Sequence, residues 1–259
     1  MEGRNWSRRF RRTPYELLDN ASSSSEPIRS TAIIAPHGGS IEQGTSELCL
    51  AIAGYTLAGP GATSPAPVPG VLQRDYWMFE GVTDNTSELH VTSTLCDDPA
   101  ALHICGSNRY AVSVHGFSEK PAKRILIGGF PEDPANPDLN QIDLNKSNKA
   151  LQLKKNLRAA FLKHYAAEPV EVGYASATSN SHLAGDDKDN IVNRTGAGFG
   201  VQLEVSRGLR EAMFGNINTA PSRRDTAGIG SGNQAYFWNG FVNAVREAVD
   251  DYERGMITS

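Results

Sequence analysis

The sequence contains little cysteine: three cysteines stand among 259 residues, and none form a C-x-x-C pair. Cys49, Cys96 and Cys105 lie in largely apolar stretches, which favours buried free thiols. A long apolar run is also missing. The longest stretch of small and apolar residues, Leu48 to Gly59, is far shorter than the roughly 20 residues that span a bilayer. We therefore expect a reducing compartment and no transmembrane segment.

The sequence also lacks the apolar core of a secretion signal. Residues 8–12, RRFRR, superficially resemble a twin-arginine motif, but TPYE follows at 13–16 where an apolar segment should stand. We interpret this stretch as a solvated basic tail. The sequence therefore predicts a cytoplasmic protein with no secretion signal.

No strong excess of positive charge is present, and the net charge is −4. This argues against a general binder of nucleic acid or of a membrane surface, so a polyanionic substrate would have to be met by a local basic site. With 39% hydrophobic and 21% charged residues, the composition is that of a globular protein. The length is sufficient for one substantial core.

Strand and helix patterns alternate along most of the chain. Residues 1–30 are polar and contain a serine run, so we predict a mobile arm there, followed by a single domain over 31–259. Strands are predicted at about 31–36, 76–80, 88–93, 110–114, 124–129, 170–174 and 201–205, with the second and third forming a hairpin. Helices are predicted at about 45–53, 98–105, 147–165, 209–214 and 234–254. This order indicates an α/β fold with a mixed, mostly parallel sheet flanked by helices.

The most informative stretch is TAIIAPHGGSIEQGTSE at 31–47. A short apolar run ends at Pro36, His37 follows at once, two glycines permit unusual backbone angles, and Glu42 comes five residues after the histidine. Imidazole nitrogen and carboxylate oxygen are ligands that protein-bound zinc accepts. The pattern is therefore typical of a metal-binding loop. The alternative is a strand-to-helix turn whose histidine caps the next helix.

A second histidine stands in the same arrangement. His115 follows the predicted strand at 110–114 and precedes Gly116, as His37 precedes Gly38. Two histidines at the ends of neighbouring strands converge on one edge of a sheet. The alternative is that His115 is a hydrogen-bonded residue at the rim.

A third candidate, Glu204, lies in a predicted buried strand. Alternation places Gln202 and Glu204 on one face of the strand and its apolar residues on the other. A buried carboxylate is costly unless it has a partner or a chemical role. The structural alternative is an ion pair with Arg207 or Arg210.

Together the three pieces are more specific than any one of them. The order HGGxIE, then VHG after a strand, then NRxGxGxGVQLE followed by Leu-Arg, resembles the poly-γ-glutamate hydrolase family over about residues 31–215. The segments LHVTS at 89–93 and DDP at 97–99 are similar to the family pattern as well. The resemblance implies a zinc-dependent amidohydrolase of phage and bacterial type with a zinc-carboxypeptidase-like fold.

The resemblance also implies roles for individual residues. His37, Glu42 and His115 match the ligands of one zinc ion, with a fourth position left open for water, and Glu204 matches the general base. Arg194 is a candidate for binding a substrate carboxylate, and Asn193 for a hydrogen bond beside it, although a buried structural arginine would show the same pattern. His90 is expected to support the site or the fold rather than bind the metal.

Three functional hypotheses follow. The first is a zinc hydrolase of γ-glutamyl amide bonds that acts as a monomer on poly-γ-glutamate or an acidic peptide, with Arg194, Arg207 and Arg210 forming a local positive cleft. The second is a zinc-dependent deacylase of small acyl-amino acids or aminoacyl esters, because the same chemistry serves any carboxylic derivative. The third is a non-catalytic binding protein in which the two histidines merely end strands.

Overall fold

The fold is described here from a computed structural model of the chain. It covers residues 2–13, 30–57, 65–83, 87–130, 144–175, 180–229 and 232–255. Within these residues the strands are β1 Trp6–Arg11, β2 Thr31–Gly39, β3 Tyr76–Gly81, β4 Tyr110–Phe117, β5 Arg124–Gly128, β6 Glu171–Tyr174 and β7 Val201–Ser206. The α-helices are α1 Thr45–Ile52, α2 Pro99–Ser107, α3 Leu144–His164, α4 Arg207–Met213, α5 Ala220–Thr226 and α6 Asn233–Gly255. Short 3-10 helices are η1 Ser93–Leu95, η2 Ser181–Leu183 and η3 Ile191–Asn193.

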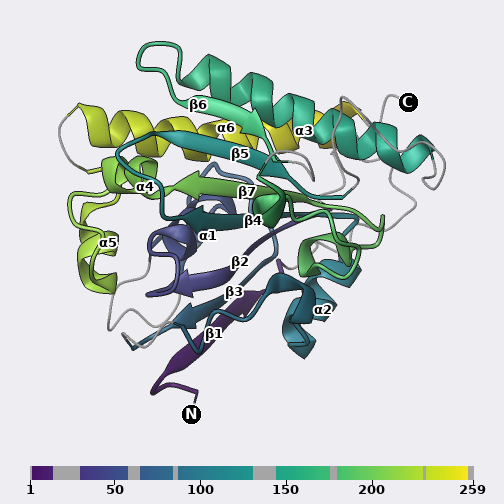
Figure 1. The fold of residues 1–259 in the computed structure, drawn as a ribbon, viewed down its shortest axis with the longest axis horizontal. Helices are drawn as coiled ribbons and strands as arrows, with labels where there is room; N and C mark the ends of the chain where they lie inside the picture. The colour runs from purple at the N-terminus through teal and green to yellow at the C-terminus, as the bar shows by residue number, and fades with distance from the viewer. Residues whose placement is uncertain are drawn as a thin grey trace.

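All the strands join in one mixed sheet with the order β1-β3-β2-β4-β7-β5-β6 (Figure 1). The pairs β3/β2, β2/β4, β4/β7 and β5/β6 are parallel, whereas β1/β3 and β7/β5 are antiparallel. The predicted mixed, mostly parallel sheet flanked by helices is therefore confirmed.

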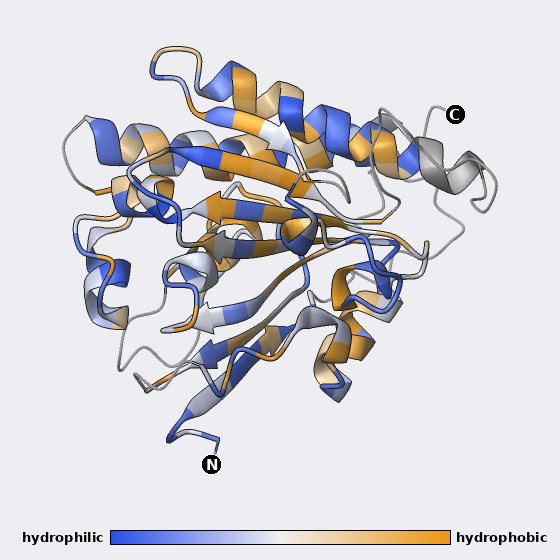
Figure 2. Cartoon of the chain, viewed as in Figure 1, coloured by the Kyte–Doolittle hydropathy of each residue, from blue (hydrophilic) through white to orange (hydrophobic). Residues whose placement is uncertain are grey.

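Each face of the sheet is covered by helices. The larger core packs α1, α3, α4 and α6 against side chains of the central strands such as Ile33, Val112 and Leu203. The opposite face carries a smaller core in which Ala32, Ile34 and Trp77 meet α2 and η3. Figure 2 shows the resulting pattern, with apolar strands between helices whose outer sides are polar. Burial on both faces explains why the central strands read as continuous apolar runs.

The central strands β2, β4 and β7 lie side by side and parallel, so their carboxyl ends meet at one edge of the sheet. Open α/β sheets bind ligands at this edge. His37 and His115 lie near the ends of β2 and β4, and the register of β4 with β7 pairs His115 with Glu204. The topology therefore gathers chemical groups that are far apart in the sequence.

The secondary structure differs from the prediction at residues 88–93 and at α5. Residues 88–93 do not form a strand or a hairpin with β3: turns occupy 87–89, and η1 begins at Ser93. The segment follows an irregular path in which His90 and Ser93 contact the site described below, while Val91 is half exposed. Helix α5 was not predicted from the sequence.

The prediction of a mobile arm over residues 1–30 is wrong for its first part, because β1 pairs with β3 as an edge strand. Two ion pairs attach it to the rest of the fold: Arg9 contacts Glu80 at 2.6 Å and Arg8 contacts Asp98 at 2.8 Å. Charged residues are common on edge strands, where they discourage pairing with other chains. Residues 14–29 lie outside the described residues.

No helix in the described part of the chain is long and apolar enough to cross a membrane.

The attachment of β1 leads to a first prediction. The Arg9→Ala substitution removes two charge-assisted hydrogen bonds to Glu80, of 2.6 and 2.7 Å, and is expected to lower the free energy of unfolding by about 1–2 kcal/mol. Arg4→Ala, at an exposed position, is the control and should change it by less than about 0.5 kcal/mol. Urea denaturation measures both. Equal stability of the Arg9→Ala protein and the wild type would show that β1 is not attached in solution.

Candidate metal centre

His37 is buried near the end of β2 and is oriented by contacts on both ring nitrogens. Its Nε2 lies 2.8 Å from the carbonyl oxygen of Val91, and its Nδ1 lies 2.8 Å from Glu42 Oε1. Because a carbonyl can only accept a hydrogen bond, Nε2 carries the hydrogen and Nδ1 of the neutral ring is bare. Metal-binding histidines are fixed in the same way, by a hydrogen bond from the nitrogen that does not bind the metal.

The loop after β2 is shaped by close backbone contacts. Gly39 has a φ of +67°, and a Cβ there would lie 2.3 Å from the carbonyl oxygen of Gly81. A Cβ on Gly38 would lie 2.2 Å from Ser46 Oγ, the atom that accepts a hydrogen bond from the Gly39 N–H. The loop closes where the Glu42 N–H donates to the carbonyl oxygen of His37 at 2.8 Å. The two glycines therefore allow the turn that returns Glu42 to His37.

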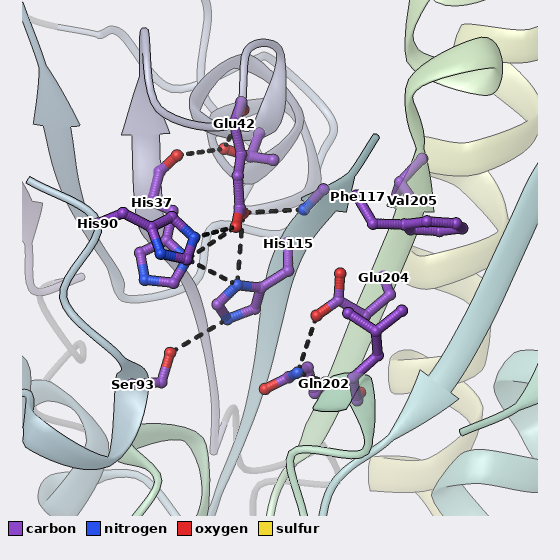
Figure 3. A network of polar contacts seen from close by, with 12 residues as sticks. His37, Glu42, His90, Ser93, His115, Phe117, Gln202, Glu204 and Val205 are labelled. Carbon is purple, nitrogen blue, oxygen red and sulfur yellow. Dashed lines mark hydrogen bonds and ion pairs between the residues drawn. The ribbon is translucent and has the colours of Figure 1, made fainter. Parts of the chain in front are cut away.

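The carboxylate of Glu42 lies at the centre of the cluster (Figure 3). Its Oε1 contacts His37 and also lies 3.2 Å from His90 Nε2, while its Oε2 accepts a hydrogen bond of 2.8 Å from the Gly116 N–H. Burial favours a raised pKa, but the charge of His115 and hydrogen bonds from His115 and His90 outweigh it and hold the pKa of Glu42 well below its ordinary value. Glu42 is therefore a carboxylate at neutral pH.

His115 points the same nitrogen at this centre. Its Nδ1 lies 3.1 Å from His37 Nδ1 and 3.4 Å from Glu42 Oε2, and its Nε2 faces Ser93 Oγ at 3.5 Å. Two atoms that each bind zinc at about 2.0–2.1 Å with a tetrahedral angle lie about 3.3 Å apart. Two Nδ1 atoms and one carboxylate group, whose Oε1 faces His37 and whose Oε2 faces His115, form a donor set that fits zinc.

His90 lies beside the same carboxylate but is more exposed. Its ring lies over that of His37, with 4.0 Å between centroids, and 51% of its side chain is accessible. Donor atoms of His37, Glu42 and His90 all lie within 4.8 Å of one another. The structure thus offers two ligand sets that share His37 and Glu42 and differ in the third residue.

Glu204 is buried next to His115 but is held by a different partner. Gln202 Nε2 donates to Glu204 Oε1 at 2.9 Å, and Gln202 Oε1 accepts from Asn190. Burial raises the pKa of Glu204 to about 7, helped by the negative charge of Glu42 and opposed by the charge of His115 and the hydrogen bond from Gln202. A carboxyl group with this pKa can exchange a proton near neutrality.

The predicted alternative for Glu204, an ion pair with Arg207 or Arg210, is not found among the described residues. Arg207 pairs with Glu211 at 2.7 Å and also bonds Gln43. Arg210 is buried and donates to three backbone carbonyl groups. With their hydrogen bonds directed at protein groups, these two arginines do not extend a positive cleft over the site.

Asn193 and Arg194 occupy different surroundings although they are adjacent. Asn193 is buried, and its amide is engaged by backbone: Oδ1 accepts from the N–H groups of Phe130 and Gly200, and Nδ2 donates to the carbonyl groups of Gly185 and Asp187. Arg194 is exposed, with one hydrogen bond of 3.2 Å to the carbonyl oxygen of Cys96. The geometry gives Asn193 a role in shaping the loop and leaves the Arg194 guanidinium accessible.

Comparison with known proteins identifies the family. The model of the poly-gamma-glutamate hydrolase family matches residues 16–64 and 68–237. The chain belongs to this family. It is 31% identical to the SPbeta prophage-derived UPF0714 protein YoqZ of Bacillus subtilis over 79% of its own length, and 29% identical to YndL of the same organism over 71%. It spans 61% and 56% of the lengths of these two relatives.

Solved structures of the family share the fold. A bacteriophage poly-gamma-glutamate hydrolase is similar with a TM-score of 0.64 and 24% identity, over 97% of this chain and 91% of that one. A zinc-free apo structure of YndL is similar with a TM-score of 0.61 and 23% identity, over 95% and 89%. These matches confirm the fold class predicted from the sequence, a single domain with a mixed sheet flanked by helices.

Several contacts of the centre were not predicted from the sequence. The alternation in β7 placed Gln202 on the same face as Glu204. This signal could have predicted their hydrogen bond, although the bond itself was not predicted. The LHVTS segment at 89–93 resembled the family pattern, but the contact of Ser93 with His115 depends on the path of an irregular segment and was not predicted. His90 was expected to support the site or the fold, and its contact with Glu42 depends on the path of the same segment.

The glycine contacts predict how the loop responds to substitution. Gly39→Ala should lower the free energy of unfolding by more than about 2 kcal/mol, because it combines a left-handed φ with a backbone collision. Gly106→Ala is the matched control: it lies in α2 with nothing within 4 Å of the new Cβ, and should stabilise the protein by up to about 1 kcal/mol. Urea denaturation compares them. A Gly39→Ala protein as stable as the wild type would contradict the described path of the loop.

Proposed function

We propose that the chain is a zinc-dependent hydrolase of γ-glutamyl amide bonds in poly-γ-glutamate or related acidic peptides. The observation that carries the proposal is the convergence of two imidazole Nδ1 atoms and a buried carboxylate within 3.4 Å of one another, at the sheet edge where ligands bind. Membership of the poly-gamma-glutamate hydrolase family supports the substrate class. The zinc-free form of the related YndL supports the choice of metal.

His37, Glu42 and His115 are the proposed ligands of one zinc ion. His115 is preferred to His90 because it is buried, because its Nδ1 faces His37 Nδ1 at 3.1 Å, and because a buried rigid donor loses less freedom on binding. When bound, zinc lowers the pKa of its water and polarises the carbonyl group to be cleaved. His90, which is more exposed, is not one of the proposed ligands.

Glu204 is the proposed general base. It lies across from His115 on the neighbouring strand, and Gln202 fixes one of its two oxygens. The other oxygen is left to take a proton from the attacking water and to donate it to the leaving amine. A pKa of about 7 places this group near the value at which both transfers are favourable.

Arg194 is the proposed contact for a substrate carboxylate. Its exposed guanidinium keeps donors that the Cys96 carbonyl group does not use, and arginine binds carboxylates through two parallel hydrogen bonds. Asn193 holds the backbone beneath it. We therefore propose that Asn193 positions the substrate site indirectly, in place of the direct hydrogen bond predicted from the sequence.

The Glu204→Gln substitution tests the proposed mechanism. It keeps the size of the side chain but removes the proton acceptor, so turnover of poly-γ-glutamate should fall by about 10²- to 10⁴-fold while one equivalent of zinc stays bound. Elemental analysis measures the metal, and the appearance of new chain ends measures turnover. Glu171→Gln, at an exposed position of β6, is the control and should retain full activity.

Three results would contradict the proposal. Full activity of the Glu204→Gln protein would contradict the assignment of Glu204 as the general base. The absence of zinc in the wild type would contradict the proposed metal centre. Faster turnover of a small acyl-amino acid than of poly-γ-glutamate would replace the proposed substrate with that of a deacylase.

A further inference from the structure

The buried arginine Arg210 has an environment that the proposed mechanism does not use. It lies on α4 with 3% of its surface exposed, and burial lowers the pKa of its guanidinium to about 10, so the group remains charged at neutral pH. No carboxylate forms an ion pair with it among the residues that the structure describes. Its charge is instead directed at backbone carbonyl oxygens.

Each of the three carbonyl groups belongs to a segment that carries a residue of the centre. Arg210 Nη1 donates to Gln43 at 2.6 Å, next to Glu42 in the sequence. Arg210 Nη2 donates to Phe117 at 3.1 Å, two residues after His115. Arg210 Nε donates to Val205 at 3.1 Å, next to Glu204. The guanidinium group of Arg210 therefore joins the loop that carries Glu42 to β4 and to β7.

Gly116 makes this arrangement sterically feasible. A Cβ at that position would lie 2.5 Å from Arg210 Cζ and 2.8 Å from its Nη2, so the guanidinium lies directly against the glycine backbone. The N–H of the same glycine donates to Glu42 Oε2 at 2.8 Å. Arg210 thus packs against the Gly116 peptide, whose N–H holds the carboxylate of Glu42.

We propose that Arg210 is a positioning residue that fixes the spacing of Glu42, His115 and Glu204 by hydrogen bonding the backbone of all three segments. It does not reach substrate, since it is buried and its hydrogen bonds are directed at the protein itself. Lysine can reproduce this role only in part, because hydrogen bonding three acceptors in different directions requires the fixed fork of a guanidinium. The proposal rests on the proposed function, because it assigns Arg210 to the same zinc centre.

The experiment compares zinc affinity, measured by competition with a chelating dye, in the wild type, Arg210→Lys, Arg210→Ala and Arg74→Ala. Arg74 is the matched control, a buried arginine that pairs with Glu253 and Asp250 near the opposite end of β2. Loss of an outer contact of a metal site typically weakens metal binding by about 10- to 100-fold. We expect this loss in Arg210→Ala and a smaller one in Arg210→Lys. Arg74→Ala should lower the melting temperature but leave zinc affinity within about twofold of the wild type.

Chemical rescue separates positioning from general destabilisation. Guanidinium ion at millimolar concentration should restore most of the zinc affinity of Arg210→Ala, because it can occupy the space left by the side chain, and should not alter that of Arg74→Ala. If Arg210→Ala does not fold, Gly116→Ala replaces it: the new Cβ displaces the guanidinium without removing its charge, and zinc affinity should fall by a similar factor.

The outcomes are distinct. Wild-type zinc affinity in Arg210→Ala overturns the positioning role and leaves the proposed function intact. Equal losses in Arg210→Ala and Arg74→Ala, with no rescue by guanidinium, also overturn it. A wild-type protein that binds no zinc overturns the proposed function and this proposal together.

Discussion

Glu42 carries a negative charge into a position from which water is nearly excluded, and the surrounding groups are arranged around that charge. A buried carboxylate is strongly destabilising unless hydrogen bonds or opposite charges compensate it. Here the compensation comes from a backbone N–H of Gly116 and from imidazole nitrogens of His90 and His115, while the bare Nδ1 of His37 faces the same carboxylate. Two of these rings also bring their Nδ1 atoms within 3.1 Å of each other. In the proposed centre, one zinc ion would be shared by the Nδ1 atoms of His37 and His115 and the carboxylate of Glu42.

The fold produces this arrangement with few elements. Parallel neighbours β2, β4 and β7 end at the same edge, so residues 78 positions apart, His37 and His115, meet without a long loop. The turn after β2 then needs glycine at Gly38 and Gly39, because neighbouring backbone and side-chain atoms occupy the space of a Cβ. Precise placement of ligands on strands is more rigid than placement on mobile loops. The sheet therefore positions His37, His115 and Glu204, and the glycine turn brings Glu42 to them.

The sequence predicted the features that follow from local pattern. Apolar runs located β2, β4, β5 and β7, and the histidines directly after two such runs located the cluster. Features set by tertiary contacts were not predictable. The arginines of β1 read as a solvated arm because their partners, Glu80 and Asp98, are distant in sequence. Residues 88–93 alternate like a strand, but their tertiary contacts, such as those of His90 with Glu42 and of Ser93 with His115, override that local preference.

The same limit applies to single residues. Asn193 and Arg194 are adjacent and polar, and nothing in the sequence separates the amide that is fully bonded to backbone from the guanidinium that is exposed. Their difference depends on the path of the chain around η3. Glu204 was identified because a carboxylate interrupts an apolar strand, a signal that is local and therefore readable.

The most direct test of the metal centre is anomalous X-ray diffraction at the zinc absorption edge from crystals of the zinc-loaded protein. We expect a single strong peak bonded to Nδ1 of His37, Nδ1 of His115 and the carboxylate of Glu42, with His90 outside the coordination shell. A peak bonded to His90 in place of His115, or no peak between these residues, would contradict it.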